Sequence, residues 1–214
     1  MNTVNSVHSQ ILREIGKMEP GNAVFPGDFK GIGSEASIKM AFVRLAKEGK
    51  LDRVSHGIYT VPKIDPRFGR IPPSLEDIAQ AIADRDHARI RPAGAFALNK
   101  LGLSTQVPMK LVYLTDGAPR TIQIGKRTIK FKPAAPRSLL YKGPISGLAV
   151  QALKELGQKA VSGEVIDKLT KLLTNEDPEL MRHDAKLAPN WISRILYVIL
   201  SNDTRNDTMA QSHG

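Results

Sequence analysis

The residues best suited to chemistry in this sequence are cations and small polar groups between residues 36 and 56. Arginine and lysine side chains can donate hydrogen bonds to guanine edges or to phosphates, and apolar methyl groups can meet thymine methyls. Side chains of these types, at helical and hairpin spacing, favour contact with a nucleic acid. The candidate contact residues are Ser37, Met40, Arg44, Lys47, Lys50, Arg53, Ser55 and His56.

A helix must position the first four of these side chains. Ser34 is a suitable N-cap and Gly49 a suitable C-terminal residue for a helix over about residues 34–48. Apolar residues at helical spacing predict one buried face, so the opposite face should point outward. The expected inward residues are Ile38, Ala41, Phe42 and Leu45; the expected outward residues are Ala36, Met40, Val43 and Lys47, flanked by Ser37 and Arg44.

A hairpin follows this helix over residues 50–61, with Gly57 supplying a positive φ in the turn. Upstream, residues 4–16 predict a helix with one buried face, and residues 23–33 predict a brief strand and a stunted helix. Three helices and then a hairpin are typical of a winged helix-turn-helix, whose third helix enters the major groove. In the alternative interpretation, helix and hairpin only pack together, and Met40 and Val43 line a dimer contact.

Proline content predicts a domain boundary after the hairpin. Residues 62–73 contain four prolines, which exclude a helix or a central strand. The predicted class is α+β, with a winged helix at 1–62, a proline-rich linker at 63–73, a mostly helical domain with a small antiparallel sheet at 74–202, and a polar tail at 203–214. Helices are expected at 74–86, 92–103, 144–157, 163–174, 178–186 and 189–200, and strands at 110–115, 120–125 and 127–132.

The charge of the chain favours a polyanionic partner. The 214 residues carry a net charge of +10, and the excess of Lys and Arg lies before residue 160. The sequence has no cysteine, which excludes disulfides, thiolate zinc sites and cysteine nucleophiles. It also has no long apolar stretch and no signal-peptide pattern, so we expect a cytoplasmic protein without membrane contact.

Two segments resemble a known family, the AbiEi-type antitoxins of type IV toxin–antitoxin systems. The matching residues are Leu45, Glu48, Gly49, Lys50, Leu51, Arg53, Val54, Gly57 and Tyr59 in the first segment, and Ala97, Leu98, Leu101, Gly102, Leu103, Gln106 and Pro108 in the second. The resemblance spans roughly residues 35–116. It implies an N-terminal domain that represses the antitoxin's own promoter, and a C-terminal part that counters a nucleotidyltransferase toxin encoded beside it. Beyond Leu139 the sequence carries no recognised motif.

A second basic element lies in the expected hairpin at 120–132, with Lys126, Arg127, Lys130 and Lys132. This basic strip could extend a DNA footprint or contact an acidic toxin, or it could be an ordinary solvated sheet face. No metal-ligand spacing, phosphate-binding loop or nucleophile motif stands out, so no enzyme activity, metal or cofactor is expected. Two alternatives remain: a winged-helix regulator without a toxin, and a basic RNA-binding protein. The sequence leaves the oligomeric state open, including a dimer on DNA.

Overall fold

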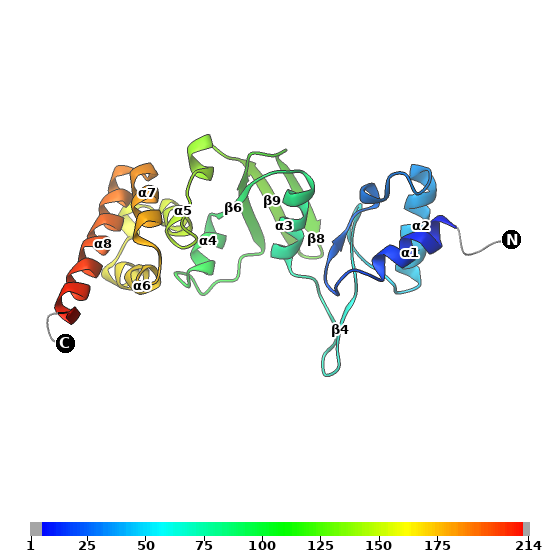
Figure 1. The fold of residues 1–214 in the computed structure, drawn as a ribbon, viewed down its shortest axis with the longest axis horizontal. Coiled ribbons are helices and arrows are strands. Elements are labelled where there is room, and N and C mark those ends of the chain that lie inside the picture. Colours follow the sequence, from blue (N-terminus) through cyan, green and yellow to red (C-terminus); the bar gives the residue numbers. More distant parts are fainter. Residues whose placement is uncertain (1–5, 212–214) are drawn as a thin grey trace. The chain divides into compact units, whose positions relative to one another are not determined.

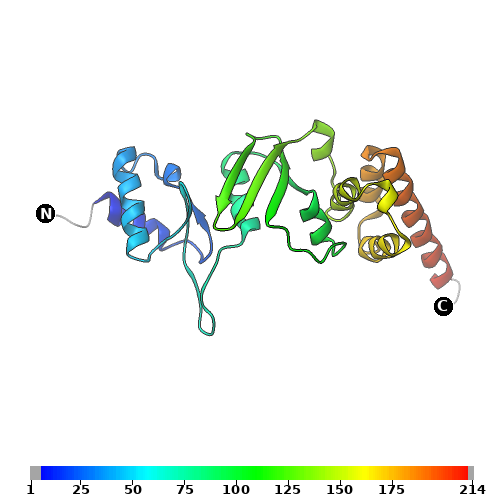
Figure 2. The same ribbon diagram turned by 180° about the vertical axis from the view of Figure 1, so that it is seen from behind.

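The computed structural model describes residues 6–211, with side chains as far as Ser201 (Figures 1 and 2). These residues form eight α-helices and three small sheets, an α+β arrangement. Contacts divide the chain into two compact units. The first extends to Asp86 and includes residues 122–126, and the second contains residues 87–121 and those from 127 onward.

Serine-capped helices build the first unit. Ser6 caps α1 (Val7–Ile15), and Ser34 caps α2 (Glu35–Lys47) by accepting a hydrogen bond from the Ser37 amide at 3.2 Å. A single 3-10 turn, η2 (Pro26–Phe29), lies between them, because proline and glycine prevent a longer helix there. The short strand and stunted helix predicted for this segment are therefore confirmed.

The buried face predicted for α2 is also confirmed. Ile38, Ala41, Phe42 and Leu45 are each at most 4% exposed. The Phe42 ring packs against the rings of Phe29 and Tyr59, with centroids 5.3 and 5.0 Å away. Tyr59 lies on β3 (Ile58–Thr60), which pairs antiparallel with both β1 (Ala23–Val24) and β2 (Asp52–Ser55), giving the sheet order β1-β3-β2. A left-handed glycine, Gly57 at φ 68°, closes the β2–β3 turn.

The proline-rich segment is a hairpin in the structure. Strands β4 (Lys63–Asp65) and β5 (Gly69–Ile71) pair antiparallel. Its prolines lie before the hairpin, in its turn and after it, so none removes a ladder hydrogen bond. The helix that follows, α3 (Leu75–Arg85), belongs by its contacts to the first unit, whereas the sequence placed it in the second domain.

The larger sheet is mixed, and the prediction of an antiparallel sheet was wrong. Its strand order is β6-β7-β9-β8, with β6 (Ile90–Ala93), β7 (Lys110–Thr115), β8 (Arg120–Ile124) and β9 (Arg127–Pro133). Strand β6 pairs antiparallel with β7, but β7 and β9 run parallel. The β8–β9 hairpin joins the sheet through its second strand, so β9 rather than β8 lies beside β7.

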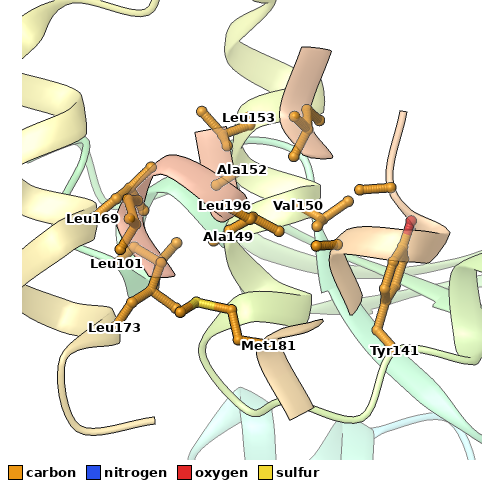
Figure 3. Packing of buried hydrophobic residues seen from close by; sticks show 14 of the residues in the cluster. Leu101, Tyr141, Ala149, Val150, Ala152, Leu153, Leu169, Leu173, Met181 and Leu196 are labelled. Carbon is orange, nitrogen blue, oxygen red and sulfur yellow. The ribbon is translucent and has the colours of Figure 1, made fainter. Parts of the chain in front are cut away.

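Helices form the rest of the second unit. They are α4 (Ala95–Lys100), α5 (Ser146–Leu156), α6 (Gly163–Leu173), α7 (Pro178–Leu187) and α8 (Asn190–Gln211), with short 3-10 turns η3 (Pro136–Leu139) and η4 (Gln158–Ala160). Figure 3 shows their aliphatic core, in which Leu153, Leu169 and Leu196 are fully buried. Trp191 is half-buried against this core.

Two features of these helices were not predicted. Helix α8 continues to Gln211, where the sequence suggested a loose polar tail, because no proline or glycine interrupts residues 190–211. Two buried carboxylates, Glu176 and Asp184, accept hydrogen bonds from the backbone amides that precede or begin α5. Asp184 also accepts a hydrogen bond from Ser146 Oγ at 2.8 Å. These acids therefore occupy the positive end of α5 and satisfy its unpaired donors.

Candidate nucleic-acid interface

The outward face of α2 is open to solvent. Met40 is 53% exposed, and Arg44 and Lys47 are exposed, while Val43 is half-buried. The inward face is closed by core packing, so the rotation of the helix is fixed. The face that the sequence predicted to point outward is therefore the face that solvent, or a groove of nucleic acid, can reach.

At the N-terminal end of this face, the serine hydroxyls are already engaged in capping α2. The Ser37 hydroxyl donates to the Ser34 carbonyl at 2.8 Å and accepts from Ser34 Oγ at 3.1 Å. Lys39 flanks the outward face on the side opposite Arg44 and pairs with Glu35 one turn earlier, at 2.5 Å. The hydrogen bond from Lys39 holds the pKa of Glu35 below its usual value. Ser37 is half-buried, and its proton is already donated within the cap.

The β2–β3 hairpin carries exposed cations beside one occupied hydroxyl. Lys50 and Arg53 are exposed, as is His56 in the turn. Ser55 Oγ donates to the carbonyl of Gln123 at 2.9 Å, within the first unit. A hydroxyl that already donates its proton to a carbonyl cannot also donate it to a phosphate. On this hairpin, Arg53 and His56 are therefore more available than Ser55 to contact a phosphate.

The basic strip is divided between the two units. Lys126 lies in the β8–β9 turn, in the segment assigned to the first unit, whereas Arg127, Lys130 and Lys132 belong to the second. Arg127 and Lys130 are half-buried, and along β9 the buried Ile129 and Phe131 alternate with Lys130 and Lys132, which point to the other face. Lys132 is exposed and lines a groove of about 530 Å³ with side chains that include Lys110, Gln151 and Lys154.

Comparison with known proteins places these elements in a family. The model of the family described as "Family of unknown function (DUF6088)" matches residues 10–181, from within α1 to within α7. The chain belongs to the DUF6088 family. The match includes α2, the β2–β3 and β4–β5 hairpins, and the basic strip.

Other comparisons add little to the DUF6088 assignment. No curated protein matches the sequence significantly. Among solved structures, the chain is similar to the RV2827C protein from Mycobacterium tuberculosis, at 16% sequence identity and a TM-score of 0.39. That similarity covers 91% of this chain and 80% of the other.

The first unit of this DUF6088 chain also contains a groove of about 760 Å³, lined by residues of α3, β1 and the adjoining loops. Asp28, Asp77 and Asp84 line it, together with Arg85, whose guanidinium lies 4.3 Å from the centre of the Phe25 ring. Burial raises the pKa of Asp28, and the charge of Arg85 partly opposes this increase. Lys63 also lines the groove, so its three carboxylates exceed its two cations, and the groove is less suited to a phosphate backbone than the outward face of α2.

Sequence reasoning missed one group of exposed side chains, on the β4–β5 hairpin. Arg67, Phe68 and Arg70 are exposed there, in a segment interpreted as a linker. The turn signal was present as Asp65-Pro66 followed by Gly69, a combination typical of a tight turn. The four prolines led to the prediction of a linker in spite of this turn signal.

Among the described residues, no group of three or more His, Asp or Glu side chains is arranged to hold a metal ion. Within the same part of the chain, no helix has the length and apolar character needed to cross a bilayer.

Proposed function

We propose that this DUF6088 chain is a DNA-binding regulator that represses its own promoter, with α2 as the helix that enters the major groove. One observation carries the proposal. The inner face of α2 is fully buried, and its outer face presents Met40, Arg44 and Lys47 to solvent. A helix held in this way can offer cations and methyl groups to base edges without losing any core packing.

The neighbouring elements support the same proposal. Their chain order is α1, β1, η2, α2, β2 and β3, and the sheet order is β1-β3-β2. This order is compatible with a winged helix, and we propose that η2 takes the place of the short second helix and that the β2–β3 hairpin is the wing. In that arrangement Lys50, Arg53 and His56 would contact phosphates that flank the groove.

We further infer that the regulator is an antitoxin. The inference depends on the resemblance of residues 45–59 and 97–108 to AbiEi-type antitoxins. In that family the N-terminal domain represses the promoter and the C-terminal part counters a nucleotidyltransferase toxin. We assign the second role to the helical part of the second unit. The alternative is a regulator of the same DNA-binding type without a toxin.

Salt dependence tests the DNA-binding proposal. The purified chain should bind a duplex taken from upstream of its own gene, and a log–log plot of affinity against salt should have a slope near −5, because about six phosphate contacts release counterions. A scrambled duplex should bind more weakly at physiological salt. Equal affinity for both duplexes would contradict the proposal of a promoter-specific repressor.

Co-expression tests the antitoxin role separately. If a nucleotidyltransferase gene adjoins this gene, its expression alone should arrest growth, and expression of the full chain with it should restore growth. Continued arrest in the presence of the chain would restrict the proposal to promoter regulation.

A further inference from the structure

The β4–β5 hairpin displays apolar side chains that most proteins bury. Phe68, at its tip, is 82% exposed, and Ile64, on its first strand, is 72% exposed. In Figures 1 and 2 the hairpin extends as a narrow loop away from the rest of the first unit. Moving a phenylalanine ring out of water lowers the free energy. A ring that is exposed to solvent is therefore a candidate contact for a partner.

The tip is ordered by its own hydrogen bonds. Asp65 Oδ1 accepts from the backbone amides of Arg67 and Phe68, at 2.7 and 3.0 Å. Pro66 restricts its own φ, and Gly69 provides the left-handed conformation, at φ 72°, that returns the chain to β5. These bonds order the backbone at Phe68 before any partner binds, which reduces the backbone entropy lost on binding.

The base of the hairpin lies at the C-terminal end of α2. Arg70 donates a hydrogen bond from Nη2 to the carbonyl of Gly49 at 3.0 Å, and its Nε lies 3.2 Å from Asp52 Oδ1. Gly49 follows Glu48, the C-cap of α2, and lies between the exposed Lys47 and Lys50. The hairpin is thus attached beside the cationic end of the helix that we propose to read DNA.

The charge on the hairpin favours a polyanion. Lys63, Arg67 and Arg70 are its cations, of which Arg70 is paired with Asp52, and Asp65 is its single acid, engaged with the backbone of the tip. An aromatic side chain on a basic, narrow hairpin suits the minor groove, where proteins insert phenylalanine between base pairs and kink the duplex. A partner protein that docked here would need an acidic surface with an apolar pocket.

We propose that the β4–β5 hairpin is a second DNA-contacting arm, whose Phe68 inserts between base pairs next to the segment read by α2. Arg67 contacts the adjacent phosphates. This inference rests on the proposed function, because α2 must hold the duplex for the arm to reach it. It adds to that function a local distortion of the DNA as part of recognition.

Fluorescence of 2-aminopurine tests the insertion directly. The full chain is titrated against duplexes from upstream of its own gene, each with 2-aminopurine at one position. Insertion of Phe68 unstacks its neighbours, so fluorescence should rise at one step or two adjacent steps. The Phe68→Ala variant should lose this rise and bind about tenfold more weakly, since a base–aromatic stack is removed. Val107→Ala, which also removes an exposed apolar side chain (69% exposed), should match the wild type.

The outcomes separate the arm from the proposed function. Loss of the fluorescence rise in Phe68→Ala, with the rise retained in Val107→Ala, supports the arm. An unchanged rise and affinity in Phe68→Ala would overturn it and leave α2-directed binding intact. Failure of Phe68→Ala to neutralise a toxin, with DNA binding unchanged, would also overturn it and assign the arm to a protein partner. Absence of any binding by the wild type would remove both the arm and the proposed function.

Discussion

At the scale of single residues, exposure and existing hydrogen bonds decide which candidate contacts are available. Arg53 and Ser55 lie on the same strand, yet Arg53 is exposed, whereas Ser55 Oγ donates to Gln123. The sequence alone gave both residues the same role. The partner of Ser55 lies 68 residues away in the sequence, so no local pattern could have identified it.

This difference predicts distinct effects of two alanine substitutions on DNA binding. Arg53→Ala should weaken binding to all duplexes alike and reduce the steepness of the salt slope by about 1, because one phosphate contact is lost. Ser55→Ala should leave the slope unchanged and lower the free energy of unfolding by about 1 kcal/mol, the value of one hydrogen bond. Salt titrations and urea unfolding measure the two effects. A flattened slope for Ser55→Ala would show that its hydroxyl contacts DNA.

At the scale of elements, local signals predicted more than long-range ones. The cap at Ser34, the glycine at 49 and the spacing of apolar residues gave the limits of α2 and its buried face to within a residue or two. Strand β6 was missed because it contains Pro92 and depends on its pairing with β7. The parallel pairing of β7 with β9 was missed because adjacent strands in the sequence usually pair with each other.

An ion pair between Arg89, just before β6, and Asp116, just after β7, predicts that the stability of the fold depends on pH. Arg89 donates to Asp116 from its side chain at 2.8 Å and from its backbone amide at 2.7 Å, and these bonds hold the pKa of Asp116 below its usual value. A carboxyl group with a depressed folded-state pKa stabilises the fold above its unfolded pKa of about 3.9, and this stability is lost as the pH falls through the folded value.

Asp116→Asn should therefore lower the melting temperature at pH 6, and its curve should converge with that of the wild type in strong acid. Thermal unfolding followed by circular dichroism over a pH series measures this. Asp167→Asn, at an exposed position on α6, is the control and should follow the wild type throughout. A constant difference between Asp116→Asn and the wild type at all pH values would exclude the ion pair as the cause.

At the scale of the whole molecule, the division into units differs from the one that proline content suggested. The predicted linker is a hairpin attached to the first unit through Arg70, and α3 is counted with that unit. Prolines mark the ends and the turn of this hairpin as well as they would mark a linker. Composition alone could not distinguish the two.

Two N-terminal fragments distinguish these divisions. A fragment of residues 1–86 includes α3, which contributes the buried side chains of Leu75, Ile78 and Ile82, and a fragment of residues 1–73 does not. The longer fragment should unfold at a higher temperature and more cooperatively. Equal or lower stability of the longer fragment would place α3 with the second unit, as the sequence suggested.

In the proposed complex, the outward face of α2 reads the DNA sequence. The most direct measurement is the ratio of affinities for the promoter duplex and a scrambled duplex, compared between wild type, Arg44→Ala and Lys39→Ala. Both variants remove one exposed cation from α2, but Lys39 is paired with Glu35. Arg44→Ala should reduce promoter affinity by about 1–3 kcal/mol while scarcely changing affinity for the scrambled duplex, and Lys39→Ala should keep the wild-type ratio. An unchanged ratio in Arg44→Ala, or an equal loss in both variants, would contradict the claim.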